Sequence, residues 1–257
     1  MSLIIKEIKM LRSLNKIHNY VLQAEDGKIG HCKDLLFDDH FWTIRYLVAD
    51  TGNWLPGLKV LLSPISFGEP DWDSRIFPVR LTKKGIEDAP KLDEHAPVNR
   101  QHEIHWTEYY GWPYYWGGSY AWGVGAHPGA LYYEKLSNKK AIEVNSESNH
   151  LRSVHEVTGY HIKESDSGIG HVKDFLADDK TWSIRYMVVD THNWLSGKKV
   201  LISPDWIDSV DWEENKVSVA LTSEQVKNSP EYDPSTGVSR EYEVRLHEFY
   251  DRPKYWK

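Results

Sequence analysis

Short hydrophobic segments separated by turn-forming residues dominate the first part of the chain. The segments are rich in β-branched and aromatic residues, and turn pairs such as Asp26-Gly27, Asp38-Asp39 and Pro56-Gly57 lie between them. The pattern predicts many short strands joined by tight turns, which is typical of a small β-barrel or sandwich. The predicted β segments are residues 20–23, 29–37, 43–50, 59–62 and 76–81.

One short helix is predicted to follow these strands, over residues 82–88. Its equivalent later in the chain, residues 222–228, begins with Thr222 and has Gln225 three residues further on, which is the spacing of a capping box. Both segments stop before a proline, Pro90 or Pro230. Each set of strands is therefore expected to close with a helical turn.

The whole pattern occurs twice. Residues 11–116 align with residues 151–256 at a constant shift of 140 positions without a gap, and 44 of the 106 aligned positions are identical. Self-similarity at a fixed spacing marks a repeat architecture. We predict two homologous domains, residues 9–116 and 149–257, with one strand order and packed about a pseudo-twofold axis. Residues 117–148 are predicted to be a linker or a packing arm.

An extension with acidic and aromatic residues at matching positions ends each copy. Glu103 and Tyr115 in the first copy correspond to Glu243 and Tyr255 in the second. Residues 117–129 have no counterpart and are rich in Gly and aromatic residues, which suits an arm that covers apolar surface.

Composition narrows the class of protein. The chain has 38 acidic and 31 basic residues and a net charge of -7. It lacks the excess of basic residues typical of nucleic-acid-binding proteins, so we do not expect nucleic acid as a partner.

No apolar run approaches the ~20 residues of a membrane span. We expect no membrane span and a cytoplasmic protein, with peripheral association with a membrane complex as a further location. The single Cys32 excludes an internal disulfide, and Val172 replaces it in the second copy, so it is predicted to be a core residue.

The turn at residues 38–39 predicts a strand register. A loop of two or four residues would place Asp34 opposite Arg45, and the second copy would place Asp174 opposite Arg185. We predict that these residues form partly buried cross-strand ion pairs that hold the hairpin in register and perform no chemistry.

Two stretches carry a resemblance to a known family. They are residues 29–64, IGHCKDLLFDDHFWTIRYLVADTGNWLPGLKVLLSP, and residues 169–204, IGHVKDFLADDKTWSIRYMVVDTHNWLSGKKVLISP. Followed by a Val-x-Leu-Thr motif and a helix ending in proline, both copies resemble the PRC-barrel family over about 75 residues each. The resemblance implies a mainly β protein of two tandem small PRC-type β-barrels, each with a short helix and an aromatic C-terminal extension.

The family is found in the cytoplasmic domain of the H subunit of photosynthetic reaction centres, in the C-terminal domain of the ribosome-maturation factor RimM and in stand-alone proteins. The H subunit has an N-terminal membrane helix, and RimM has a separate N-terminal domain. Neither feature is recognisable in this sequence. The resemblance therefore implies a non-catalytic scaffold that binds other proteins.

Polar and aromatic residues retained in both copies are the candidates for a site. Trp54 can stack on a ligand ring, whereas His31 lacks a retained Ser or Cys nucleophile that it could activate. We therefore predict no catalytic residue and no enzyme activity. The candidate binding residues are His31, His171, Trp54, Trp194, Lys59 and Lys199.

The best candidate metal site is the His102-x-x-His105 pair with Glu103 and Glu108, because this spacing brings two imidazoles together on a helical turn. The second copy has Tyr242 and Arg245 at the two histidine positions. We therefore expect no bound metal. No glycine-rich loop follows a strand and opens a helix, so no nucleotide or other cofactor is expected.

The favoured function is protein binding or assembly without catalysis. The partner is another protein, and a second copy of the chain is a further candidate. One alternative is a small-molecule- or metal-responsive regulator or enzyme with a site between the barrels, and another is an accessory of a membrane electron-transfer complex resembling the H subunit. Exposed apolar patches would favour the first function, and a deep pocket with convergent polar groups would favour the second.

Overall fold

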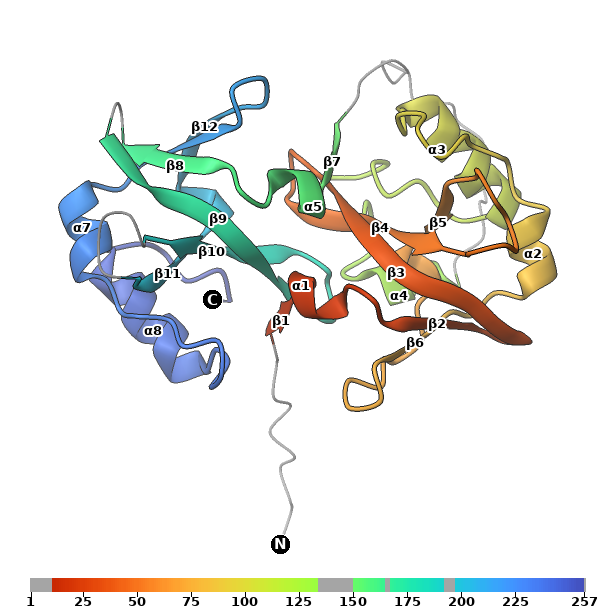
Figure 1. Cartoon of the computed structure of the whole chain (residues 1–257), viewed down its shortest axis with the longest axis horizontal. Coiled ribbons are helices and arrows are strands. Elements are labelled where there is room, and N and C mark those ends of the chain that lie inside the picture. Colours follow the sequence, from red (N-terminus) through yellow and green to blue (C-terminus); the bar gives the residue numbers. More distant parts are fainter. Residues whose placement is uncertain (1–10, 134–149, 165–166, 192–196, 257) are drawn as a thin grey trace, which may run out of the picture. The chain divides into compact units, whose positions relative to one another are not determined.

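The computed structural model describes residues 11–133, 150–164, 167–191 and 197–256 (Figure 1). It has more strand than helix and two β-sheets, one in each of two units. Unit 1 consists of Met1–Ser13, Glu156–Asp179 and Ile184–Lys257, and unit 2 of Leu14–His155 and Lys180–Ser183. Among the described helices, none has the length and apolar character that a membrane crossing requires.

The sheet of unit 2 comes mostly from the first sequence copy. Its strands are β2 (Val21–Ala24), β3 (Gly27–Asp38), β4 (Thr43–Asp50), β5 (Val60–Leu62) and β6 (Ile76–Pro78), in the order β5-β4-β3-β2-β6, and β7 (Leu151–Ser153) pairs with β3. Pairing is antiparallel except between β2 and β6, which are parallel. The predicted strands are confirmed, with small shifts at their ends.

The equivalent sheet in unit 1 has the same strand order. Its strands are β8 (His161–Glu164), β9 (Ser167–Asp178), β10 (Ile184–Asp190), β11 (Lys199–Ile202), β12 (Ile207–Asp211) and β13 (Lys216–Val219), in the order β11-β10-β9-β8-β13-β12, and β1 (Leu11–Ser13) pairs with β9. At the shift of 140 positions, β8 to β11 and β13 correspond to β2 to β6. The two copies of the gap-free repeat therefore form sheets in which the corresponding strands have the same order.

Neither sheet closes into a barrel in the described part of the chain, so the predicted barrel closure is wrong. In unit 2, β5 and β6 remain at opposite edges of the sheet. Trp106, from the helix α3 (Arg100–Tyr110), instead packs with Tyr46, Val48 and Leu61 in one buried cluster. The aromatic extension thus supplies the apolar cover for β4 and β5 that barrel closure would have supplied.

The two predicted short helices are confirmed. Thr82 caps α2 (Lys83–Glu87), and Thr222 with Gln225 forms the full capping box of α7 (Ser223–Asn228). The other short helical segments are α1 (Leu14–Ile17), α4 (Pro128–Leu131), α5 (Val154–Val157) and the 3₁₀ turns Pro64–Ser66 and Pro204–Trp206.

Helices in the two extensions were not predicted. α3 and α8 (Arg240–Phe249) begin after the caps Asn99 and Ser239, whose side chains accept backbone N–H groups of the first turn. Charged and aromatic residues dominate both segments, so their hydrophobic periodicity is weak.

The hairpin has a register different from the predicted one, because Asp38 lies opposite Thr43, whereas the predicted alignment would place it opposite Phe41. A bulge then leaves Arg45 without a pairing partner on β3, and beyond it Asp34 lies opposite Val48. The predicted alignment of Asp34 with Arg45 is therefore wrong. In the second copy, Asp174 is opposite Val188 and not Arg185, so that alignment is wrong as well. A bulge inserts one extra residue into a strand, which the alternation of residue types does not reveal.

Segments distant in sequence complete the core of unit 2. The ring of Trp182 is buried, with its centroid 5.3 Å from that of Phe67 and 5.6 Å from that of Phe77. Trp122 is buried too, and its Nε1 donates to the carbonyl oxygen of Thr181 at 2.6 Å. The arm around Trp122 therefore belongs to the core of unit 2.

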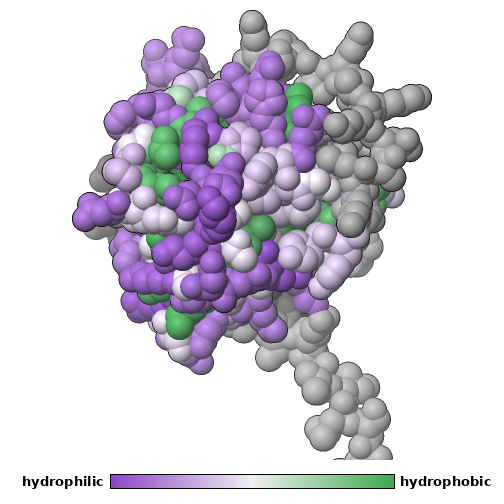
Figure 2. Space-filling view, turned by 90° about the vertical axis from the view of Figure 1, so that its right-hand side faces the viewer, coloured by the Kyte–Doolittle hydropathy of each residue, from purple (hydrophilic) through white to green (hydrophobic). Residues whose placement is uncertain are grey.

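Hydrophobic residues form small separate groups among hydrophilic ones on the face drawn in Figure 2. The drawn part of this face therefore lacks the broad apolar patch that by itself would mark a docking surface. The large hydrophobic side chains that stay exposed are Phe41, Tyr109, Tyr120, Val124, Tyr133 and Phe249.

Gly30 lies where β3 approaches the end of β4. A Cβ atom at Gly30 would overlap the backbone carbonyl of Asp50. Gly30→Ala is therefore expected to lower the free energy of unfolding by about 3 kcal/mol, measured by urea denaturation. Gly168 in β9 has open space around its Cα, so Gly168→Ala should change stability by less than about 0.5 kcal/mol. Equal effects of the two changes would contradict the close approach.

Candidate functional site

Each sheet includes a three-residue strand from the start of the other sequence copy. β7 opens the second copy but pairs antiparallel with the end of β3 in unit 2. β1 opens the first copy but pairs with the end of β9 in unit 1. Both strands have the sequence Leu-Arg-Ser, and their arginines lie opposite Phe37 and Ala177 at equivalent positions. Each sheet therefore pairs an added strand with the end of its longest strand, β3 or β9, beyond the residues that pair with β2 or β8.

Side chains hold the added strand in unit 2. The hydroxyl of Ser153 donates to Oδ2 of Asp34 at 2.5 Å, and the backbone N–H of His155 donates to Oδ1 of the same carboxylate at 3.2 Å. Nε of Arg152 donates to Oδ2 of Asp39 at 2.9 Å. We call these contacts the clasp. Because a three-residue strand forms few backbone hydrogen bonds, charge-assisted bonds to its side chains contribute much of its attachment.

Unit 1 has the same clasp. The hydroxyl of Ser13 donates to Oδ2 of Asp174 at 2.5 Å, and Nε of Arg12 donates to Oδ2 of Asp179 at 2.9 Å. Burial raises the pKa of the Asp179 carboxyl, and the adjacent Arg12 guanidinium opposes that shift. These four residues are identical to their equivalents at the shift of 140 positions. Their identity in both copies is the sequence signal from which the clasp could have been recognised.

The predicted ion pair between Asp34 and Arg45 is absent, because the observed register separates the two side chains and each has another partner. Asp34 binds the added strand. Arg45 pairs with Asp38 instead, with 2.6 Å between Nε and Oδ2, and both side chains are buried. Arg45 thus has the predicted structural role with a different acid.

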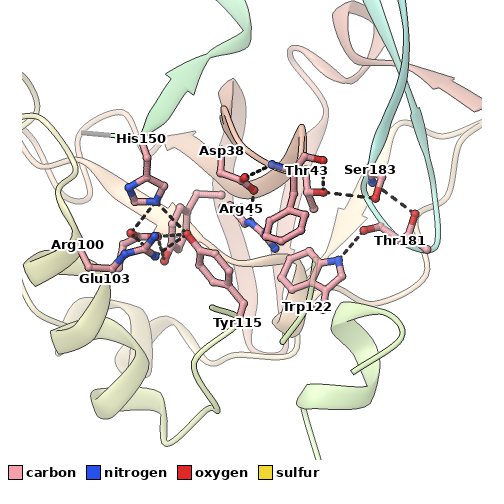
Figure 3. A network of polar contacts seen from close by, with 12 residues as sticks. Asp38, Thr43, Arg45, Arg100, Glu103, Tyr115, Trp122, His150, Thr181 and Ser183 are labelled. Atoms are coloured by element: carbon pink, nitrogen blue, oxygen red, sulfur yellow. Dashed lines mark hydrogen bonds and ion pairs between the residues drawn. The ribbon is translucent and has the colours of Figure 1, made fainter. Parts of the chain in front are cut away.

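Aromatic rings surround the buried guanidinium of Arg45 (Figure 3). Its central carbon lies 3.9 Å from the ring centroid of Tyr115 and 4.7 Å from that of Trp122. Cation–π attraction is strongest where water is excluded, as it is here. Arg45 therefore joins β4 to the extension and to the arm.

Glu103 is the centre of a second buried network in unit 2 (Figure 3). Its carboxylate accepts hydrogen bonds from the hydroxyls of Tyr115 at 2.7 Å and Tyr46 at 3.2 Å. It also lies 3.0 Å from Nη1 of Arg100 and 3.1 Å from Nε2 of His150. Burial, reinforced by the Glu103 charge, holds the pKa values of both tyrosines well above their ordinary value. This network attaches α3 to the sheet.

The second copy repeats the network around Glu243. Its carboxylate accepts from the hydroxyls of Tyr255 at 2.7 Å and Tyr186 at 3.1 Å, and Nη1 of Arg240 lies 2.7 Å away. The matching glutamates and tyrosines of the extensions therefore have a structural explanation.

A cavity of about 250 Å³ adjoins the clasp in unit 2. Four retained charged residues line it: Lys33, Asp34, Asp50 and Lys59. Nζ of Lys33 lies 2.6 Å from Oε1 of Glu94, and this contact raises the pKa of the lysine and lowers that of the glutamate. Of the predicted binding residues in the first copy, Lys59 is the one that lines this cavity.

The other candidates of the first copy lie elsewhere. His31 is opposite Asp50 in the ladder, and its Nε2 lies 3.2 Å from Nζ of Lys28. The ring of Trp54 faces Nζ of Lys83 at 4.7 Å. Neither residue lines the cavity.

In the second copy, His171 and Lys199 both lie opposite Asp190, one on each side of β10. Trp194 falls outside the described residues.

The His102 and His105 pair lies on α3. The backbone N–H of His102 donates to the Asn99 cap, and its ring centroid is 6.4 Å from that of Trp106. The described residues contain no group of three or more His, Cys, Asp or Glu side chains placed to hold a metal ion.

Comparison with protein families identifies one domain. Residues 152–226 match the family model of the PRC-barrel domain. The chain therefore contains one PRC-barrel domain over these residues, from Arg152 in β7 to Val226 in α7. No curated protein matches the chain. The matched range begins with the strand that is added to the sheet of unit 2, so the sequence domain and the folded unit have different boundaries.

The clasp should contribute measurably to stability. Arg152→Ala and Asp39→Ala are each expected to lower the free energy of unfolding by about 1–2 kcal/mol, and the double variant by less than the sum, because both side chains are only 22% exposed. The control is the Lys84–Asp88 pair, whose side chains are 73% and 49% exposed. Its coupling energy should stay below about 0.5 kcal/mol. Equal coupling in the two double-mutant cycles would contradict this prediction.

The Arg45–Asp38 pair should behave as a buried ion pair. Arg45→Met leaves the Asp38 carboxylate buried without its counter-charge, so a loss of about 3–5 kcal/mol in unfolding free energy is expected. Adding Asp38→Asn removes that charge and leaves an oxygen for the Phe41 N–H, which Asp38 Oδ1 accepts at 2.6 Å. The double variant should recover part of the loss in thermal unfolding. A double variant no more stable than Arg45→Met would contradict the pairing.

Proposed function

We propose that this chain is a non-enzymatic binding and assembly module made of two PRC-barrel repeats, which binds an extended segment of a protein partner at the edges of β3 and β9. The PRC-barrel domain at residues 152–226 supports a binding or assembly role. The 44 identities in 106 positions and the shared strand order support a second repeat in the first copy.

The added strand is the observation that carries the proposal. Strand addition supplies backbone hydrogen bonds to any extended segment, and pockets or charges for alternate side chains give specificity. Here Asp39 binds the arginine and Asp34 binds the serine that follows it. The preferred partner segment therefore contains an apolar residue, an arginine and a hydroxyl residue in succession.

A peptide titration of the full chain tests this function. In the double variant Arg12→Ala with Ser13→Ala, the clasp of unit 1 loses its own ligand side chains but keeps Asp174 and Asp179. A fluorescent peptide of residues 9–16, KMLRSLNK, should bind this variant at least about tenfold more tightly than it binds the unmodified chain, as measured by fluorescence anisotropy.

Two controls define the interpretation. The peptide with both arginine and serine replaced by alanine should not bind, and adding Asp174→Asn to the variant should abolish binding of the original peptide. Circular dichroism checks that each variant is folded. Equal binding of the original and alanine peptides to a folded variant would refute recognition by the clasp.

A further inference from the structure

The cavity beside the clasp in unit 2 is lined by both apolar and charged side chains. Leu36, Val48, Ala49, Leu55 and Leu58 supply apolar lining, and Lys33, Lys59, Asp34, Asp50 and Glu94 supply the charged groups. At about 250 Å³ it lies just below the range of cavities that hold drug-sized ligands. Its size therefore suits a short molecule.

Contacts within the chain occupy the acidic groups of the cavity. Asp34 accepts the hydroxyl of Ser153 and the backbone N–H groups of Leu35 and His155. Asp50 accepts the N–H of Gly52 at 2.9 Å through Oδ1. Glu94 is paired with Lys33. A cationic ligand would have to compete with these contacts.

Lys59 differs from these groups. Its Nζ donates to the carbonyl oxygen of Ala96 at 2.5 Å, and no carboxylate of the described residues lies within ion-pair distance of it. Burial lowers the pKa of Lys59, the charge of Lys33 lowers it further, and the more distant charges of Asp93, Asp34 and Glu94 oppose this shift only in part. A partly buried ammonium with a neutral partner gains from an added anion.

We infer that this cavity binds a short-chain monocarboxylate, with Lys59 as the counter-charge of its carboxylate and the leucine and valine side chains around its hydrocarbon tail. The lining residues Lys33, Asp34, Asp50 and Lys59 recur in the second copy as Lys173, Asp174, Asp190 and Lys199.

Calorimetric titration of the full chain with butyrate tests the site, with n-butanol and n-butylamine as neutral and cationic controls of similar size. Butyrate should bind and the two controls should not. Lys59→Gln removes the charge but keeps a donor for Ala96, and it should weaken butyrate binding at least tenfold. Lys59→Arg keeps the charge and should retain binding within about threefold. Lys84→Gln, at an exposed lysine, should have no effect.

Absence of butyrate binding at about 20 mM would overturn the inference, and so would binding of butylamine in its place or an equal affinity in folded Lys59→Gln. Circular dichroism checks the fold of each variant. The inference does not depend on the proposed function, because the peptide titration reports on β9 in unit 1. Either result can therefore fail alone.

Discussion

The bond between a serine hydroxyl and an aspartate, Ser153 with Asp34 and Ser13 with Asp174, is the constraint on which both sheets depend. It fixes a strand of only three residues, which backbone hydrogen bonds alone would hold weakly. A carboxylate that accepts a short hydroxyl hydrogen bond is stronger than a neutral acceptor, and the neighbouring arginine pair fixes the direction of the strand. Since strand and acceptor come from different sequence copies, each folded unit needs both copies.

Burial of charge accounts for much of the aromatic composition. Arg45 lies against Tyr115 and Trp122, and Arg185 lies 4.2 Å from the ring of Tyr255. A guanidinium removed from water requires an anion, hydrogen bonds or aromatic faces to offset its lost hydration. The extensions supply these groups where barrel closure would have supplied backbone pairing. The aromatic residues of the extensions and of the arm therefore serve the interior in this region.

The sequence predicted the strands, the two short helices and the duplication, because alternation, turn residues and a capping box are local signals. The added strands could not be predicted, since a Leu-Arg-Ser segment present in both copies can pair with either copy equally well. The register was missed for a different reason: the hairpin turns after Asp38 and a bulge follows at Arg45, so Arg45 pairs with Asp38 and not with Asp34. For the site, comparing the copies singled out Asp34 and Lys59 among the retained residues. It gave no information on which residue Asp34 contacts.

An edge filled by its own chain changes what an outside partner must do. A tethered strand acts at an effective concentration that reaches the millimolar range for short flexible connections, so a free segment with the same three side chains competes poorly. A successful partner must therefore add contacts beyond those of Leu151, Arg152 and Ser153. In unit 2, the adjacent surface is the cavity that Ser153 itself lines, where Lys59 donates to a backbone carbonyl oxygen. A partner segment with an acidic residue close to its arginine and hydroxyl residues would use both features, which would give the proposed module selectivity that strand pairing alone lacks.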